Sequence, residues 1–239
     1  MMQTIKMEND HVKMIAHRGV SGLERENTCA AFVAAGNRSY FGIETDIHRT
    51  SDGRFVVFHD DSTQRLTELD WNVEEHTMEE LRTLRLKDLD ENVRGDLVLP
   101  TLEEYIRICK KYEKTAVLEL KNPFAQEDIQ SVVEILRKEG WLDHTIFISF
   151  ALSNMICLRG LLPEQPLQYL VKEFTDQVAE NLAAYNLDLD ISYKTLTEEQ
   201  VRRVHSLGHT VNVWTVNEAA DAERLIEMGV DYITTNILE

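Results

Sequence analysis

Two histidines, two carboxylates and an arginine stand at positions where they could act together in catalysis. His17 and Arg18 follow one short hydrophobic run, Glu44 and Asp46 alternate within a second, and His59 follows a third. Imidazole groups transfer protons near neutral pH, guanidinium groups bind anions, and grouped carboxylates bind hard cations. These residue types indicate acid–base chemistry on an anionic ester, of the kind that cleaves phosphate esters.

The composition favours a single enzyme-sized domain with a small-molecule partner. Of the 239 residues, 43% are hydrophobic and 28% are charged, and the formal net charge is -17. So acidic a chain is repelled by nucleic-acid backbones and by anionic membrane surfaces. An anionic substrate would therefore need a local positive site, from a metal ion or from a few Arg and Lys side chains.

Cysteine content and hydropathy predict a cytoplasmic protein without membrane insertion. Cys29, Cys109 and Cys157 are far apart and odd in number, which is typical of reduced thiols rather than of a disulfide framework or a zinc cluster. Residues 1–13 are polar, without an apolar signal core, and no run of about 18 apolar residues occurs.

Hydrophobic patterning predicts strands and helices in alternation along the chain. Strands are expected at residues 12–16, 42–47, 55–58, 116–120, 146–149, 168–171, 187–191, 210–214 and 232–235. Helices are expected at residues 127–138, 153–161, 176–185, 198–207 and 218–228. A further helix is expected to begin at Asn27 and end at Gly36, and capping boxes at Thr77, Thr101 and Thr197 each indicate a helix start.

This order of elements predicts a closed (β/α)8 barrel of TIM type. The strands at 42–47 and 55–58 have no helix between them and are expected to form a hairpin. Without the second of these, eight βα units remain, which implies a closed parallel barrel. An open, doubly wound sheet is the alternative, although the segment Gly19–Gly22 matches a phosphate-binding loop poorly. Residues 1–239 are expected to form one domain, with an irregular excursion from the barrel at about 61–99.

The polar residues at strand ends predict a metal site on the barrel's active face. Glu44 and Asp46 share one face of their strand, and Glu119 and Lys121 repeat that spacing on the next barrel strand. Three grouped carboxylates repel one another unless a hard ion such as Mg²⁺ or Ca²⁺ neutralises them. The alternative is a set of buried salt bridges to Arg18 and Lys121.

The histidines at strand ends are the natural proton carriers. His17 and His59 lie beside the acids, which favours catalysis over a structural role. His48 is expected on the same face of its strand as Glu44 and Asp46 and is a candidate for the rim of the site. Trp214 ends another strand and suits a core position and a substrate contact equally well.

Taken together, the motifs of this chain resemble the glycerophosphodiester phosphodiesterase family. The matching segments are HRGVSG at 17–22, ENT at 26–28, GIETD at 42–46, TSDG at 50–53, HD at 59–60, RLT at 65–67, PTLEE at 100–104, ELK at 119–121, SF at 149–150, WTVN at 214–217 and GVDYITTN at 229–236. They span nearly the whole chain in the family's order. One departure is Arg25, where the family usually has proline, and it is expected to alter the loop and to add a positive charge near the mouth.

The resemblance implies hydrolysis of glycerophosphodiesters to sn-glycerol 3-phosphate and an alcohol, a reaction of lipid and glycerol metabolism. It implies that Mg²⁺ or Ca²⁺ binds to three carboxylates and that two histidines form the acid/base pair. It also implies that an arginine holds the phosphate, with a lysine beside the substrate, and that residues from about 61 to 99 form a small inserted cap. In this chain these residues are Glu44, Asp46 and Glu119 for the metal, His17 and His59 for proton transfer, and Arg18 and Lys121 for the substrate.

Two mechanisms and two other functions stay open at this point. The glycerol 2-hydroxyl can attack phosphorus to give a cyclic phosphate that water then opens, or a metal-bound water can attack directly. A lyase or phospholipase of the same barrel class would stop at the cyclic phosphate, and a non-catalytic barrel would only bind a phosphorylated ligand. The leaving alcohol, the choice of cation and the oligomeric state are not predicted.

Overall fold

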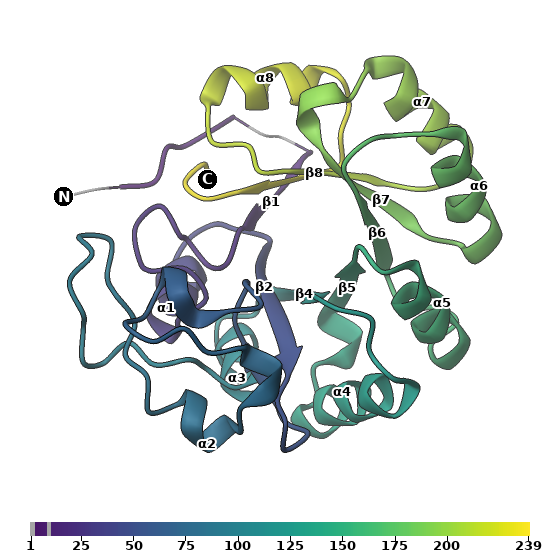
Figure 1. Ribbon diagram of the computed structural model, residues 1–239. Helices are drawn as coiled ribbons and strands as arrows, with labels where there is room; N and C mark the ends of the chain where they lie inside the picture. Colours follow the sequence, from purple (N-terminus) through teal and green to yellow (C-terminus); the bar gives the residue numbers. More distant parts are fainter. Residues whose placement is uncertain (1–2, 9–10) are drawn as a thin grey trace.

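Eight parallel strands close into a barrel in the computed structural model, which describes residues 3–8 and 11–239 (Figure 1). The barrel strands are β1 (Lys13–Ala16), β2 (Gly42–Arg49), β4 (Thr115–Leu120), β5 (Thr145–Ser149), β6 (Leu167–Val171), β7 (Asp188–Ser192), β8 (Val211–Trp214) and β9 (Tyr232–Thr235). β1 pairs in parallel with both β2 and β9, which closes the ring. The predicted (β/α)8 barrel is confirmed, and the open sheet is excluded.

One further strand, β3 (Phe55–Val57), lies outside the ring. It pairs with β2 in antiparallel register, with Ile47 opposite Val57 and Arg49 opposite Phe55. This arrangement confirms the predicted hairpin. Its turn continues β2 beyond the barrel and returns the chain to the carboxyl end of the barrel, where His59 follows β3.

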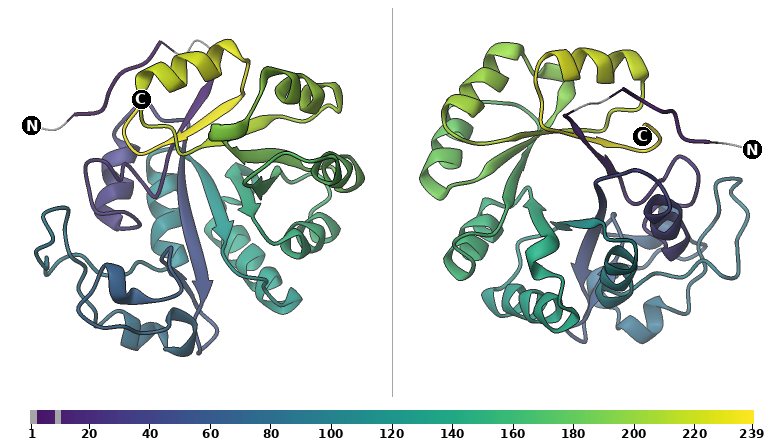
Figure 2. Two further views of the ribbon diagram at one scale, coloured as in Figure 1. Left: turned by 45° about the horizontal axis from the view of Figure 1, so that its top comes forward. Right: turned by 180° about the vertical axis from the view of Figure 1, so that it is seen from behind.

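Helices connect successive barrel strands and cover the outside of the ring (Figure 2). They are α1 (Cys29–Gly36), α3 (Leu102–Lys111), α4 (Gln126–Glu139), α5 (Leu152–Leu161), α6 (Asp176–Tyr185), α7 (Glu198–Ser206) and α8 (Ala219–Glu227). The capping boxes predicted at Thr101 and Thr197 are present at α3 and α7. Each satisfies backbone N–H groups that a helix start leaves unpaired.

The predicted cap of α1 is wrong by one residue. Thr28, not Asn27, is the N-cap, and its hydroxyl oxygen accepts a hydrogen bond from the backbone N–H of Ala31. Asn27 has a positive φ of 55°, in the left-handed region that asparagine tolerates better than most residues. That conformation releases its side chain from capping and turns it toward β2.

Hydrophobic side chains fill the barrel on both sides of the strands. A large cluster lies between the strands and the surrounding helices, with Phe32, Tyr105 and Phe147 among its fully buried members. A small cluster inside the ring includes Ile15 and Val117. Because successive strand residues face opposite sides, this double burial makes the strands almost continuously hydrophobic. Polar residues within them are therefore exceptional.

The segment 61–99 is an irregular excursion between β3 and α3. It contains the short helix α2 (Met78–Leu81), which starts with the predicted capping box at Thr77, and two 3-10 turns, η1 (Thr63–Arg65) and η2 (Val73–Glu75). Its apolar side chains form a separate cluster with those of Val56 and Phe58. The segment thus packs on its own small core beside the barrel.

Arg25 anchors the loop before α1 to this excursion. It is only 7% exposed, and its guanidinium pairs with the Glu91 carboxylate at 3.1 Å and with the backbone carbonyl of Asp88. The positive charge of Arg25, which was expected near the mouth of the barrel, is thus neutralised by the Glu91 carboxylate of the excursion. Arg25 does not line the pocket described below.

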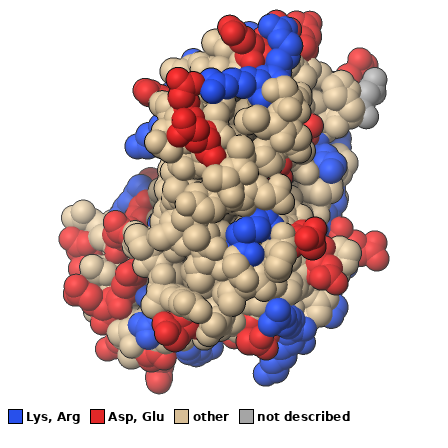
Figure 3. All heavy atoms as spheres, turned by 90° about the vertical axis from the view of Figure 1, so that its right-hand side faces the viewer, with Lys and Arg blue, Asp and Glu red and all other residues tan. Residues whose placement is uncertain are grey.

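The two ends of the described chain lie together. Ile5 forms a parallel bridge with Leu238, and Met7 and Glu239 share a backbone hydrogen bond of 2.7 Å. In the face drawn in Figure 3, acidic side chains gather mainly toward the margins and uncharged atoms cover most of the centre. Among the described residues, no helix has both the length and the apolar character to cross a membrane.

Candidate active site

A left-handed turn at the end of β1 joins the first histidine to the carboxylates. Arg18 and Gly19 have φ values of 52° and 76°, and a Cβ on Gly19 would lie 2.6 Å from that of Ala31. Only glycine fits so close to α1. The turn directs the backbone N–H of Arg18 to Glu44 Oε2 at 2.7 Å and places His17 beside the barrel's mouth.

Three carboxylates converge at the carboxyl ends of β2 and β4. Glu44, Asp46 and Glu119 are buried, and each offers an oxygen within 4.8 Å of the other two. Asp46 Oδ1 and Glu119 Oε1 are buried, and among the described residues their close cationic contact is Lys121 Nζ, at 3.4 Å and 3.0 Å. Three carboxyl groups whose oxygens converge in this way fit a hard divalent cation. The predicted carboxylate cluster is therefore present, with the chemistry that a cation requires.

Burial and mutual repulsion set the protonation of this cluster. Burial and the neighbouring charges of Asp46 and Glu119 raise the pKa of Glu44 well above its ordinary value. Burial and the charge of Asp46 raise the pKa of Glu119 to about 8. Asp46 is also buried, but the charges of Arg18 and Lys121 outweigh that effect and lower its pKa. The cluster thus carries more negative charge than its surroundings can stabilise.

Two cationic side chains flank the carboxylates without neutralising them all. Lys121 Nζ lies 3.0 Å from Glu119 and 3.4 Å from Asp46, and Arg18 Nε lies 3.5 Å from Asp46. Arg18 also binds Glu26 at 2.7 Å, so its charge is shared. The salt bridges considered as the alternative to metal binding therefore exist, but within residues 3–8 and 11–239 the side chain of Glu44 accepts a hydrogen bond only from the backbone N–H of Arg18.

His17 is held by an asparagine from the end of the chain. Its Nδ1 lies 2.7 Å from the side-chain oxygen of Asn236, which also accepts a hydrogen bond from Ser21. An amide oxygen only accepts, so Nδ1 carries the hydrogen and Nε2 keeps its lone pair. Burial and the charge of Arg18 lower the pKa of His17 to about 4. His17 is thus neutral at pH 7 and suited to accept a proton.

His59 lies across the pocket and is held by an acid. Its Nδ1 contacts the Asp60 carboxylate at 2.6 Å, and the other oxygen of Asp60 accepts a hydrogen bond from Arg65 at 2.6 Å. Arg65 in turn binds both oxygens of Glu26, the partner of Arg18. Burial lowers the pKa of His59, while the negative charges of Asp46 and Asp60 oppose that change. An adjacent carboxylate stabilises imidazolium, which suits a proton donor.

His48 lies behind His59 rather than at the rim of the pocket. It is 0% exposed, and its Nε2 is 3.3 Å from the backbone carbonyl oxygen of His59. Its Nδ1 lies 3.0 Å from Glu74 of η2, to which Asn122 also donates at 2.8 Å. His48 therefore connects the excursion to the segment that carries His59.

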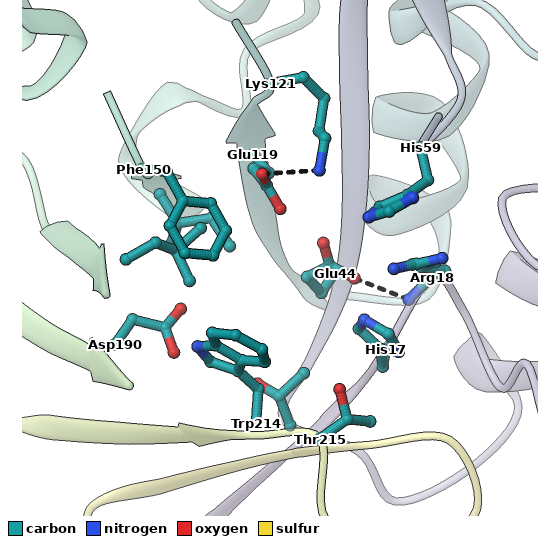
Figure 4. Close-up of a pocket in the computed structure, with 13 residues that line it drawn as sticks. His17, Arg18, Glu44, His59, Glu119, Lys121, Phe150, Asp190, Trp214 and Thr215 are labelled. Atoms are coloured by element: carbon teal, nitrogen blue, oxygen red, sulfur yellow. Dashed lines mark hydrogen bonds and ion pairs between the residues drawn. The ribbon is translucent and has the colours of Figure 1, made fainter. Parts of the chain in front are cut away.

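The opposite side of the pocket is apolar, as Figure 4 shows. Ile148, Phe150 and Leu170 line it together with Trp214, whose ring meets that of Phe150 edge-on at 5.8 Å. The polar groups on this side are Asp190 of β7, the indole N–H of Trp214, and the hydroxyl groups of Thr215 and Thr234. Both sides enclose about 110 Å³, well below the roughly 300–1,000 Å³ of pockets for drug-sized ligands. The pocket therefore suits a small polar molecule.

The pocket brings most of the predicted site residues together. His17, Arg18, Glu44, His59, Glu119, Lys121 and Trp214 all line it. Asp46 lies directly behind this lining, where it contacts both Arg18 and Lys121. Ser149, which also ends a strand, is instead buried and donates to the Leu120 carbonyl.

Three polar residues near the site were not predicted. Asn27 donates to Asp46 at 2.8 Å and accepts from Thr45, Asn236 orients His17, and Asp190 faces the pocket from β7. Asn27 and Asn236 belong to the matching motifs, so their positions were visible although their contacts were not. Asp190 lies in none of the matching segments, but its position within a hydrophobic strand was a usable signal.

A parallel barrel with two histidines, clustered carboxylates and two cations at its carboxyl end defines a barrel hydrolase acting on an anionic ester. The chain belongs to the glycerophosphoryl diester phosphodiesterase family, whose model matches residues 17–239. It is thus a phosphoric diester hydrolase, and the resemblance found in the motifs is confirmed.

Individual relatives agree in length and in fold. A glycerophosphodiester phosphodiesterase of Bacillus subtilis is 28% identical over 95% of this chain and 84% of its own length. The structure of an Oleispira antarctica phosphodiesterase in complex with the product sn-glycerol-3-phosphate is 28% identical, with a TM-score of 0.87 over 97% of this chain and 95% of that one. A glycerophosphodiester phosphodiesterase of Thermotoga maritima is 27% identical, with a TM-score of 0.77 and 95% of each chain covered.

Proposed function

We propose that this protein hydrolyses glycerophosphodiesters to sn-glycerol 3-phosphate and an alcohol, with a divalent cation and two histidines. The observation that carries the proposal is the pocket in which His17 and His59 face one carboxylate cluster (Figure 4). The product held by the Oleispira antarctica relative supports the same product here.

The carboxylates of Glu44, Asp46 and Glu119 would hold Mg²⁺ or Ca²⁺. The convergence of their buried oxygens and their mutual repulsion support this assignment. When bound, the cation supplies positive charge that makes a substrate hydroxyl more acidic and stabilises the charge that develops on the phosphate.

Arg18 and Lys121 bind the phosphate oxygens of the substrate. Both already lie within ion-pair distance of the carboxylates, so their charges point into the same small space. Glu26 and Arg65 hold the guanidinium of Arg18 in place from behind. Trp214 forms an apolar wall against which the carbon atoms of the substrate pack.

In the first step, His17 Nε2 removes the proton of the glycerol 2-hydroxyl. The oxygen attacks phosphorus in line, the bond from phosphorus to the leaving alcohol breaks, and His59 protonates the departing oxygen. The free lone pair of His17 Nε2 and the contact of His59 Nδ1 with the Asp60 carboxylate support this division of roles. The products of the step are a cyclic glycerol phosphate and the free alcohol.

In the second step, the histidines exchange roles. His59, now neutral, removes a proton from water, the hydroxide opens the ring at phosphorus, and His17 returns its proton to the 2-oxygen. The result is sn-glycerol 3-phosphate with both histidines restored. The pocket contains two separate proton carriers, which supports a mechanism in which each histidine accepts one proton in one step and donates it in the other.

The proposal is tested by ³¹P NMR of the purified protein after removal of metal with EDTA. Mg²⁺ or Ca²⁺ is then restored in the presence of glycerophosphocholine or glycerophosphoglycerol. We expect a glycerol 3-phosphate signal that depends on the cation, with a transient cyclic phosphate. A stable cyclic product would identify a lyase, direct formation of product without it would favour attack by water, and no turnover would refute hydrolysis of these diesters.

We also propose that the chain is one barrel domain and that residues 61–99 act as its inserted cap. Two contacts support this role. Arg65 binds Asp60 beside His59, and Glu74 binds His48 behind it. The cap thus reaches the second histidine from two sides.

A further inference from the structure

Asp190 is a buried acid in the pocket that the mechanism above does not use. It lies in the middle of β7, is 2% exposed and lines the pocket. Its Oδ1 has no hydrogen-bond partner among the described residues. The adjacent polar residues satisfy one another instead, because Asn212 donates to Gln168 at 3.0 Å and accepts from Thr234 at 3.1 Å. Asp190 is left without a partner and faces the substrate space.

A second polar atom without a partner lies on the same side. The indole Nε1 of Trp214 is buried and donates to none of the described residues. Figure 4 shows the nitrogen edge of Trp214 turned toward Asp190. The rest of this side consists of Ile148, Leu170 and Phe150, whose side chains form no hydrogen bonds, together with Thr215 and with Thr234, whose hydroxyl already donates to Asn212. Buried polar groups of native proteins usually have partners, so two such groups facing one space indicate a missing one.

The two groups together select the chemistry of that partner. An indole N–H only donates, so its partner must have a lone pair. A carboxyl group offers an acceptor oxygen, so the partner must also donate. A hydroxyl group does both. A quaternary ammonium has neither an acceptor nor an N–H, and a protonated amine would leave the indole unpaired.

We propose that Asp190 and Trp214 bind the terminal hydroxyl of the substrate's glyceryl arm, which makes Asp190 a residue that determines specificity for glycerol. This inference rests on the proposed function and extends it. The phosphate and the 2-hydroxyl have partners on the charged side of the pocket, and the terminal hydroxyl is the one glyceryl group without a partner there.

The position of Asp190 favours the glyceryl arm over the leaving alcohol. Asp190 is enclosed, whereas Phe150 at the edge of the same wall is 39% exposed. A free volume of about 110 Å³ suits the glycerophosphate part of the diester, which is common to all substrates of this class. The leaving alcohol is released to solvent and is expected on the open side.

Calorimetry with two small phosphates tests the proposal without requiring turnover. sn-Glycerol 3-phosphate is compared with propane-1,2-diol 1-phosphate, which lacks only the terminal hydroxyl, in the presence of Mg²⁺. We expect wild type to bind the first at least about tenfold more tightly. Asp190→Leu should bind both with the weaker affinity, and Asp190→Asn, which keeps a polar group of the same shape, should recover part of the difference.

Two results would overturn the inference. One is an equal loss of affinity for both phosphates in Asp190→Leu, which would mean that Asp190 only shapes the pocket. The other is a loss of turnover confined to choline or ethanolamine diesters, which would assign Asp190 to the leaving group. A melting temperature of each variant at or above that of wild type excludes unfolding as the cause. Selective binding by a wild type that cleaves no diester would refute the proposed hydrolysis and support the hydroxyl site.

Discussion

The two sides of the pocket come from different parts of the chain and differ in chemistry. β1, β2, β4 and the segment after β3 supply the histidines, the carboxylates and the cations, whereas β5 to β8 supply Ile148, Phe150, Leu170, Asp190 and Trp214. The charged side is formed within the first 121 residues and the apolar side after them. In Figure 4 the boundary between them passes between the carboxylate cluster and the aromatic wall.

The two sides also differ in how their polar groups are satisfied. On the charged side a continuous series of contacts joins His59, Asp60, Arg65, Glu26 and Arg18. Such networks position reactive groups before the substrate arrives. On the apolar side, Asp190 Oδ1 and the indole N–H of Trp214 have no partner among the described residues, so a ligand must supply their hydrogen bonds. We infer that the charged side determines the reaction and the apolar side determines what reacts.

The largest effect should follow from loss of either histidine on the charged side. His17→Ala and His59→Ala each remove a proton carrier, so turnover should fall by about 10² to 10⁴-fold. The rate of glycerol 3-phosphate formation, followed by ³¹P NMR, measures the loss. His11→Ala, at an exposed position, is the matched control and should retain full activity. Near wild-type turnover in a folded His17 or His59 variant would show that the assignment of proton carriers is wrong.

The same substitution on the two sides should change stability in opposite directions. Asp46→Leu leaves Arg18 and Asn27 without their buried partner, so the free energy of unfolding should fall by about 3–5 kcal/mol. Asp190→Leu removes a buried acid that has no such partner, so the free energy of unfolding should rise by about 1 kcal/mol. Urea denaturation without metal measures both values.

The contrast between these variants separates structural from functional acids. A loss of stability in Asp190→Leu similar to that in Asp46→Leu would mean that Asp190 has stabilising contacts in the folded chain. It would then be an ordinary structural residue. A gain in stability together with a loss of glycerol recognition is the result expected of a residue retained for binding.

Cation affinity on the charged side should rise with pH. Glu119 is protonated in the metal-free protein below its pKa of about 8 and must lose that proton to bind a cation. The affinity for Mg²⁺ should therefore increase by up to about tenfold per pH unit as pH rises toward 8. Calorimetry at several pH values measures it. Glu119→Gln should bind Mg²⁺ weakly and lose the part of the dependence that comes from Glu119, while Glu44, whose pKa is also raised, keeps its own part.

The free energy of unfolding of the metal-free protein should fall as pH rises, whereas its cation affinity should increase. The folded pKa of Glu119 lies above its ordinary value of 4.5, so the folded state binds the proton more tightly than the unfolded state. This contribution is complete below pH 4.5 and is lost as pH rises through about 8. Saturating Mg²⁺ should reverse the trend in melting temperature, whereas a trend that Mg²⁺ leaves unchanged would argue against cation binding at this cluster.

The charged side was largely predictable from sequence because its residues occupy strand ends in a regular fold. Alternating strands and helices fixed the barrel, and strand ends then placed His17 and Glu44 on one face. The turn at Arg18 and the loop conformation of Asn27 were not predictable, since both depend on positive φ values that the local sequence permits but does not require. Their contacts with Glu44 and Asp46 follow from that backbone geometry.

The apolar side was less predictable because two acids that alternate along a strand can either face the pocket or bond to the backbone of a neighbouring strand. Asp188 and Asp190 are spaced like Glu44 and Asp46, yet Asp188 accepts a hydrogen bond from the Thr210 backbone at 2.7 Å. Only Asp190 faces the pocket. Spacing identifies the side of a strand, whereas depth along the barrel decides whether an acid meets substrate or backbone.

The smallest effect should come from His48, which links the cap to the charged side. His48→Leu removes the contacts with Glu74 and with the His59 carbonyl, so His59 loses support without leaving the pocket. We expect kcat to fall by about fivefold, roughly 1 kcal/mol in the barrier, with KM unchanged. Glu74→Gln should cause a smaller loss, because an amide can still bond the ring. If both variants instead raised KM at constant kcat, the cap would act on substrate binding rather than on the position of His59.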